Sequence, residues 1–180
     1  NSTGGYNTAI GGDMAMYYNT TGWYNTAVGH QALSSNSAGN SATAIGCRAL
    51  FYANNTATAF TNRNVAVGYE ALRGSLTASA NTGNYNTAIG FQSLWTNTTG
   101  DYNSGFGTIS LVNNTTGHRN TAIGYAALTN NNIGYRNTAV GVDAMYYNQS
   151  GNYNSAIGHV ALFNNTTGYN NYAGGYTALY

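Results

Sequence analysis

The sequence predicts an all-β fold, a parallel β-solenoid or β-roll of about ten coils with about seventeen residues in each coil. Three observations predict it: one motif recurs along the whole chain, a glycine recurs within it at nearly constant spacing, and apolar residues keep fixed distances from that glycine. A unit of this length cannot enclose a core of its own, so identical units must stack and share one.

The motif reads G-x-[YR]-N-T-A-[IV]-G-x-x-A-L-x-x-N-T-T, as residues 83–99 illustrate. We use the word column for the residues at one position of successive units. The glycine column consists of Gly11, Gly29, Gly46, Gly68, Gly90, Gly107, Gly124, Gly141, Gly158 and Gly175. Most spacings are 17 residues, and two adjacent units, near 47–68 and 69–90, are longer. Residues 1–180 are therefore expected to form one repeat domain of ten units.

Two apolar columns are expected to form ladders inside the solenoid. The first lies directly before the glycine and is the predicted core ladder: Ile10, Val28, Ile45, Val67, Ile89, Ile123, Val140 and Ile157, with Phe106 in the sixth unit. The second lies four residues after the glycine and consists mainly of leucine, from Leu33 to Leu179.

An asparagine column lies four residues before the glycine and is broken once, at Ala42. Stacked asparagines can form a ladder of side-chain amides that hydrogen-bond from one coil to the next. The recurring glycine fits a bend that needs a positive φ or a close approach of two backbones.

Within each unit, N-T-A-[IV] predicts a short strand, because Thr, Val and Ile favour pleated structure. Alternation along this strand places Ile and Ala on opposite faces. The segment x-x-A-L-x-x-N fits a second strand or a single helical turn, and N-T-T-G predicts a turn. A repeat of small helical hairpins is disfavoured by the frequent Gly, Asn and Thr residues.

The composition excludes several classes of function. Only 5% of the residues are charged and the net charge is +1, so no nucleic acid partner or anionic membrane surface is expected. No apolar run is long enough to insert into a membrane as a helix. The single cysteine, Cys47, has no partner for an internal disulfide and is expected to be a buried thiol, so the redox compartment stays open.

No catalytic residue, metal site or cofactor is predicted. Asp13, Glu70 and Asp143 share one column, two residues after the glycine, which is typical of an exposed edge and not of a catalytic set. The three histidines have no neighbours at the spacing of metal ligands. The chain is therefore not expected to be an enzyme.

The core motif N-[TS]-A-[IV]-G resembles the repeats in the heads of trimeric autotransporter adhesins. Its longer form, N-T-A-I-G-x-x-A-L-x-x-N-T-T-G, resembles repeats of bacteriophage tail-fibre proteins. The resemblance covers nearly the whole chain and implies a parallel β-roll, self-association and an extracellular, cell-surface or virion-surface location. The added A-L segment departs from the adhesin heads and leaves a trimer and a single-chain solenoid as alternatives.

The chain begins and ends partway through the motif. The last residues Ala178, Leu179 and Tyr180 lack the N-T-T-G part, and Asn1, Ser2, Thr3 and Gly4 supply a similar segment. Because neither end has a polar cap, we expect these residues to be self-assembly ends that dock head to tail. Such a contact does not close and produces a filament. A piece cut from a longer repeat array is the alternative.

Two features are candidates for binding. The tyrosines Tyr6, Tyr24, Tyr85, Tyr102 and Tyr153 share a column and predict an aromatic strip that could stack on carbohydrate or pack against other fibres. The extra residues of the two longer units, near 52–61 and 73–82, are expected to bulge side by side, and such insertions often mark a binding face.

The sequence therefore predicts a structural extracellular fibre subunit whose partner is another copy of itself. One alternative is an adhesin or phage tail-fibre module that recognises surface glycans. A further alternative is an ice-binding solenoid, since regular Thr and Asn ladders can order water. The Tyr and Arg residues two positions before the Thr column argue against a flat ice-binding face.

Overall fold

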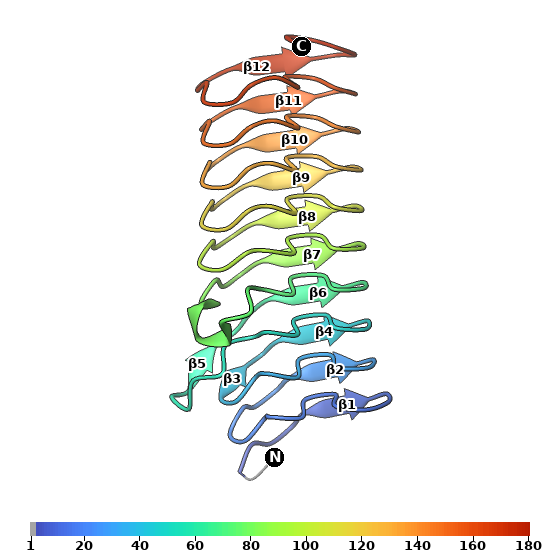
Figure 1. Cartoon of the computed structure of the whole chain (residues 1–180), viewed down its shortest axis with the longest axis vertical. Helices are drawn as coiled ribbons and strands as arrows, with labels where there is room; N and C mark the ends of the chain where they lie inside the picture. Colours follow the sequence, from blue (N-terminus) through green and yellow to red (C-terminus); the bar gives the residue numbers. More distant parts are fainter. Residues whose placement is uncertain (1–2) are drawn as a thin grey trace.

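The computed structural model describes residues 3–180 as a stack of ten coils, a parallel β-solenoid (Figure 1). Each coil contributes one strand of three residues to a single parallel sheet. In stacking order these strands are β1 (Thr8–Ile10), β2 (Thr26–Val28), β4 (Thr43–Ile45), β6 (Val65–Val67), β7 (Thr87–Ile89), β8 (Ser104–Phe106), β9 (Thr121–Ile123), β10 (Thr138–Val140), β11 (Ser155–Ile157) and β12 (Tyr172–Gly174).

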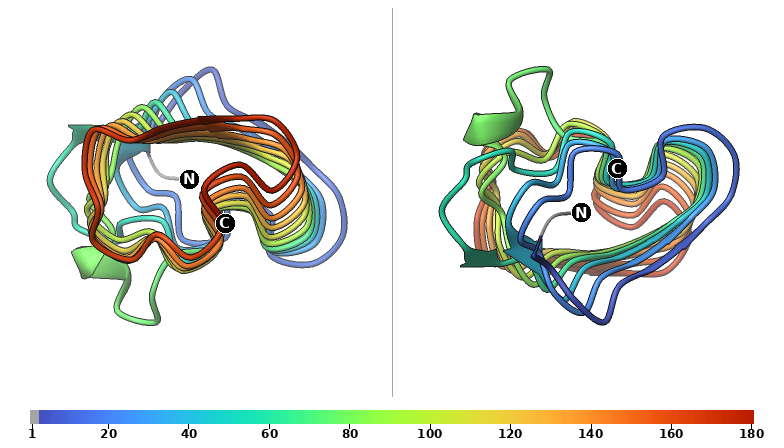
Figure 2. Two further views of the ribbon diagram at one scale, coloured as in Figure 1. Left: turned by 90° about the horizontal axis from the view of Figure 1, so that it is seen from above. Right: turned by 90° about the horizontal axis from the view of Figure 1, so that it is seen from below.

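The strands pair in the register of the repeat, so that equivalent positions of successive units lie side by side, for example Thr to Thr and Ala to Ala between β1 and β2. The two longer coils keep this register, because Thr43 pairs with Val65 and Val65 pairs with Thr87. The first longer coil contains an additional strand, β5 (Phe60–Thr61), which pairs with β3 (Gly39–Asn40) of the coil before it, and the second contains a turn of 3-10 helix, η1 (Ala78–Ala80). The extra residues of both longer coils project beyond the outline of the other coils, as expected (Figure 2).

The predicted core ladder of Ile and Val is wrong, because these side chains point out of the solenoid. Ile10, Ile45, Ile89, Ile123 and Ile157 are 38–59% exposed, and Val28, Val67 and Val140 are half-buried. The alanine in the middle of the strand lies inside, and Ala27, Ala88 and Ala122 are fully buried. Alternation along the strand puts Ala on the same face as the asparagine two residues earlier, so an inward asparagine requires an outward Ile.

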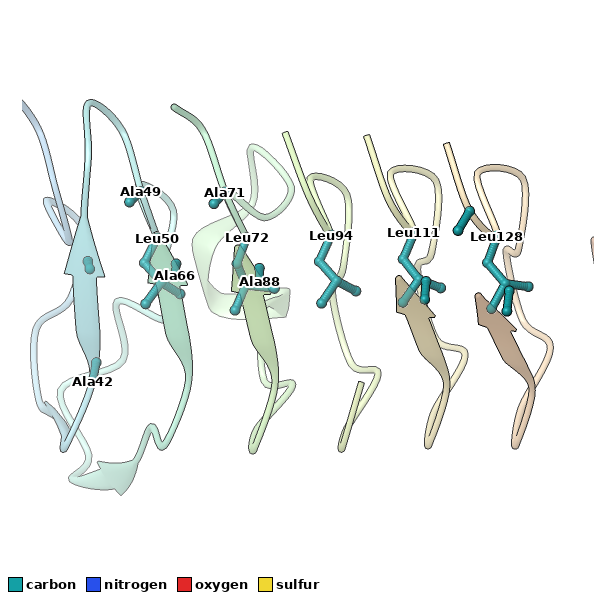
Figure 3. Close-up of a cluster of buried hydrophobic side chains, with 14 of the residues drawn as sticks. Ala42, Ala49, Leu50, Ala66, Ala71, Leu72, Ala88, Leu94, Leu111 and Leu128 are labelled. Carbon is teal, nitrogen blue, oxygen red and sulfur yellow. The ribbon is translucent and has the colours of Figure 1, made fainter. Parts of the chain in front are cut away.

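The leucine column does lie inside, as expected, and forms the continuous apolar core (Figure 3). Leu33, Leu94, Leu111 and Leu128 are fully buried, and Met145 occupies the same place in the eighth coil. A second column of small residues, including Ala32, Ala49 and Ser93, lies directly before the leucines and is also buried. Beside the buried asparagines described below, the interior of a typical coil therefore holds one large and two small side chains.

The segment x-x-A-L-x-x-N is neither a strand nor a helical turn. The φ angle alternates in sign along this segment and is positive at the second and fourth residues after the glycine, as at Gln92 (51°) and Leu94 (52°). The left-handed conformation costs an L-residue about 1–2 kcal/mol. We infer that hydrogen bonds between coils offset this cost, since the Leu94 N–H donates to the Ser110 carbonyl of the next coil at 2.9 Å.

The predicted asparagine ladder is confirmed. The side-chain oxygen of Asn103 accepts a hydrogen bond from the backbone N–H of Asn120 at 3.0 Å, and Asn120 serves Asn137 in the same way. The Asn120 amide also donates to the carbonyl of Gly134 at 2.8 Å, which ties the strand to the next turn. These asparagines are fully buried, so each coil is joined to its neighbours by amides as well as by the sheet.

A second buried ladder, which was not predicted from the sequence, is formed by the asparagine of N-T-T-G. Asn114, Asn131 and Asn148 each donate to the side-chain oxygen of the equivalent residue one coil earlier, at 2.7–2.8 Å. Each also donates to the carbonyl of the glycine three residues later, at 3.0–3.1 Å. This bond closes the turn, which explains why the motif keeps both its asparagine and its glycine.

Because the Leu side chains lie inside and the Ile and Val side chains point out, substitutions in the two columns should differ in their effect on stability. Leu128→Ala is expected to lower the free energy of unfolding by about 2–5 kcal/mol, since it empties a fully buried site. Ile123→Ala, at a position 43% exposed, is expected to cost less than about 1.5 kcal/mol. Urea unfolding monitored by circular dichroism compares the two variants. Equal losses would contradict the outward placement of the Ile and Val side chains.

Candidate functional surfaces

The outer face of the sheet presents two uncharged columns along the length of the stack. One consists of Thr or Ser in most coils and the other of Ile or Val, and both are half-buried or exposed. Val65 and Tyr172 interrupt the first column, and Phe106 and Gly174 interrupt the second. Neither column is therefore unbroken along the stack.

The tyrosine column is arranged as short stacks and not as one continuous strip. Tyr6 stacks on Tyr24 with ring centroids 5.2 Å apart, and Tyr85 stacks on Tyr102 at 4.8 Å. Tyr153 lies apart from both pairs, with the guanidinium of Arg136 5.2 Å from the centre of its ring. All five tyrosines are 40–77% exposed. The structure therefore places the predicted aromatic strip on the surface, but in three separate parts.

The acidic column is exposed at Asp13 and half-buried at Asp143, as an edge would be, but the expectation is wrong for Glu70. Glu70 is buried, with its carboxylate 3.4 Å from Arg48 and 3.6 Å from Arg73, and it accepts a hydrogen bond from Gln92 at 3.0 Å. Arg73 also lies over the rings of Tyr52 and Trp95. The cluster therefore ties together the two longer coils and the coil above them.

The remaining titratable side chains do not gather into a reactive centre. Cys47 is half-buried rather than buried, and its sulfur lies 3.8 Å from Nδ1 of His30. Within residues 3–180, no three His, Cys, Asp or Glu side chains are close enough to hold a metal ion. The same part of the chain contains no helix that is long and apolar enough to cross a membrane.

The last described coil exposes residues that are buried everywhere else in the stack. Leu179 is 63% exposed, whereas Leu128 at the same position of an inner coil is fully buried. A Cβ built on Gly175 would have no atom within 4 Å, whereas one built on Gly158 would lie 2.3 Å from the carbonyl oxygen of Gly175. Of the predicted self-assembly ends, Thr3, Gly4, Ala178, Leu179 and Tyr180 are described, and Asn1 and Ser2 lie outside the described residues.

A groove of about 550 Å³ runs along coils five to eight, and we call it the polar groove. Thr96, Asn113 and Asn130 form one column of its lining, and Thr115, Asn132 and Gln149 form the other; Ile133 and Ser150 complete it. Asn113 donates to the side chain of Asn130 at 3.2 Å, and Thr115 donates to the side chain of Asn132. None of the lining residues is charged.

Several Asn residues in N-x-[ST] triplets belong to the inside of the solenoid. Asn19, Asn54, Asn97, Asn114 and Asn148 are buried, whereas Asn113 and Asn164 are exposed. Enzymatic glycosylation of the folded chain could therefore reach Asn113 and Asn164, whereas the buried asparagines are held by their hydrogen bonds.

The sequence predicted the aromatic column and the assembly ends but not the polar groove. The groove is lined by the residues that flank the buried asparagine of N-T-T-G. Reading this segment as a plain turn hid its alternation of inward and outward side chains. Compared with known protein-family models, curated proteins and solved structures, the chain gives no significant match.

Proposed function

We propose that this protein is a structural subunit of an extracellular or surface fibre, assembled by end-to-end stacking of solenoids. The observation that carries the proposal is the last described coil, whose upper surface has the shape and chemistry of a surface that receives another coil. Leu179, Tyr176 and Tyr180 are 63–75% exposed there. Burying such side chains is worth about 1.5–3 kcal/mol each, which favours contact with a further coil.

A second copy of the chain is the occupant that fits this surface. The first described coil presents the opposite side of the same repeat, and its strand β1 is exposed at all three residues. Parallel strands in register supply matching donors and acceptors, so the two surfaces can continue the sheet and the ladder of Asn7. Each added copy leaves the same surface open, and growth along one axis follows.

The sides of the solenoid also support a structural role. The low charge removes the repulsion that keeps most soluble proteins apart. The exposed Ile and Val column gives neighbouring rods an apolar line of contact along the sheet. A trimer or a bundle of rods would use this column, and end-to-end assembly does not require it.

Electron microscopy of the purified chain over a concentration series tests the proposal. We expect uniform filaments with an axial repeat of about 45–50 Å, since ten coils at about 4.8 Å each make one subunit. Leu179→Asp would place a charge in the contact between two subunits, and it is expected to abolish filaments while leaving the circular dichroism spectrum unchanged. Discrete rods of one subunit length at every concentration would refute end-to-end stacking.

Tyr125→Asp is the matched control, because Tyr125 is 52% exposed on the side of a central coil. Filaments should persist in this variant. Loss of assembly in Tyr125→Asp but not in Leu179→Asp would instead assign the contact to the sides of the solenoid, and it would contradict the proposed ends.

A further inference from the structure

The polar groove has a chemistry that neither the core nor end-to-end stacking requires. Core residues of this solenoid are Ala, Leu and buried Asn, and each is held by its neighbours. By contrast, Gln149 is exposed, and its side-chain amide has no hydrogen-bond partner among the described residues. The hydroxyl group of Ser150 is likewise free within that part of the chain. These groups can bond to a ligand without breaking any contact of the protein.

The groups in the groove fit an uncharged ligand that is rich in hydroxyl groups. Amides and hydroxyls both donate and accept hydrogen bonds, and the lining holds no charge that would attract an ion. Asn130 illustrates this, because its oxygen accepts from Asn113 while its nitrogen donates to the Tyr146 carbonyl at 3.1 Å. Such bonds fix the orientation of the amides and prepare them for a ligand.

The groove is also linear and periodic. Equivalent residues of successive coils are about 4.8 Å apart, because the coils are joined as neighbouring strands of a sheet. An extended chain of pyranose sugars advances by a similar step for each sugar, so one sugar can meet one pair of lining residues in each coil. A compact ligand would contact only one or two coils, whereas an extended chain can contact all four coils that line the groove.

Both ends of the groove are marked by departures from the repeat. At the end toward the N-terminus, the extra residues of the coil that carries η1 occupy the segment that lines the groove in the coils above (Figure 1). Gly83, which follows these extra residues, donates to the Thr98 carbonyl of the next coil at 2.8 Å. At the other end, the position equivalent to Asn130 in the next coil is occupied by Tyr147, whose ring is 43% exposed. An exposed aromatic ring is a surface on which the apolar face of a sugar can stack.

We infer that the polar groove binds a neutral polysaccharide chain that lies along the axis of the solenoid. Gln149 donates and accepts hydrogen bonds with the sugar hydroxyls, and Tyr147 stacks against a sugar ring where the chain leaves the groove. The tyrosine strip predicted from the sequence lies on another column and is not part of this site. The inference concerns the side of the rod and is independent of end-to-end stacking.

Affinity gel electrophoresis of the full chain tests the inference, with hydroxyethylcellulose, galactomannan and dextran as neutral probes and alginate as the anionic probe. The Leu179→Asp background is included so that filament growth does not alter mobility. We expect retardation by at least one neutral polysaccharide and none by alginate. Migration unaffected by all neutral probes, or equal retardation by alginate, would overturn the inference.

Two variants locate the site. Tyr147→Ala and Gln149→Ala are each expected to weaken binding by about threefold to tenfold, since one stacking contact or one hydrogen bond is lost. Tyr125→Ala removes a ring of similar exposure away from the groove and should leave binding unchanged. If the two groove variants bind as tightly as the parent while Tyr125→Ala does not, the sugar is held elsewhere and the assignment is wrong.

Discussion

Gly124→Ala is expected to lower the free energy of unfolding by about 2–6 kcal/mol, from backbone strain together with overpacking between coils. Gly124 has a φ of +133°, a conformation that L-residues rarely adopt. A Cβ at this position would lie 2.5 Å from the carbonyl oxygen of Gly141 in the next coil. Neither backbone can move away, because the N–H of Gly141 is bonded to the Ile123 carbonyl at 2.8 Å.

Gly175→Ala is the control that separates the two contributions. Its φ of +113° carries a comparable strain, but the added Cβ meets no atom within 4 Å. We therefore expect only the strain cost, about 1–3 kcal/mol. Urea unfolding of the two variants under conditions without assembly gives the difference. If both variants lose the same free energy, the close approach of the coils does not contribute, and the glycine column serves backbone conformation alone.

The periodicity of the sequence was enough to predict the solenoid, its strand and the leucine core. Each of these depends on the spacing between residues, and a repeat displays its spacings directly. The prediction that the Ile and Val side chains point inward was wrong, because it rested on their hydrophobicity and not on the alternation of side chains along the strand. Asn120, Ala122 and Ile123 could not all point inward, and the side chain at an odd distance from the asparagine had to face out.

The surfaces were harder to predict for a different reason. The polar groove follows from the path that the backbone takes from Gly124 to Gly134, and this path has a positive φ at Ala126 and Leu128, neither of which is glycine. Ordinary propensities do not predict the left-handed conformation at Ala or Leu. Hydrogen bonds between stacked coils impose it, and these exist only once the solenoid has formed.

Asn120→Ala is expected to destabilise the solenoid by about 3–5 kcal/mol, because it leaves one buried backbone N–H without an acceptor and removes three further buried hydrogen bonds. The backbone N–H of Asn137 would lose its acceptor, and the carbonyl of Gly134 would keep only the hydrogen bond from Asn131. Thermal and urea unfolding measure the loss. Asn164→Ala, which removes an exposed amide, is the matched control and is expected to change stability by less than about 0.5 kcal/mol.

The chain itself contains an alanine in this column, and its surroundings support the expected cost. Ala42 still donates its N–H to the side chain of Asn25 at 2.9 Å, but it offers no acceptor to the coil above. There the missing oxygen is replaced by Asn62, which accepts from the side chain of Asn64 at 2.7 Å and from its N–H at 3.3 Å. Asn62→Ala should therefore destabilise the solenoid as Asn120→Ala does. If Asn62→Ala proves neutral, the buried amides are not needed as acceptors, and the ladder stabilises the stack by packing alone.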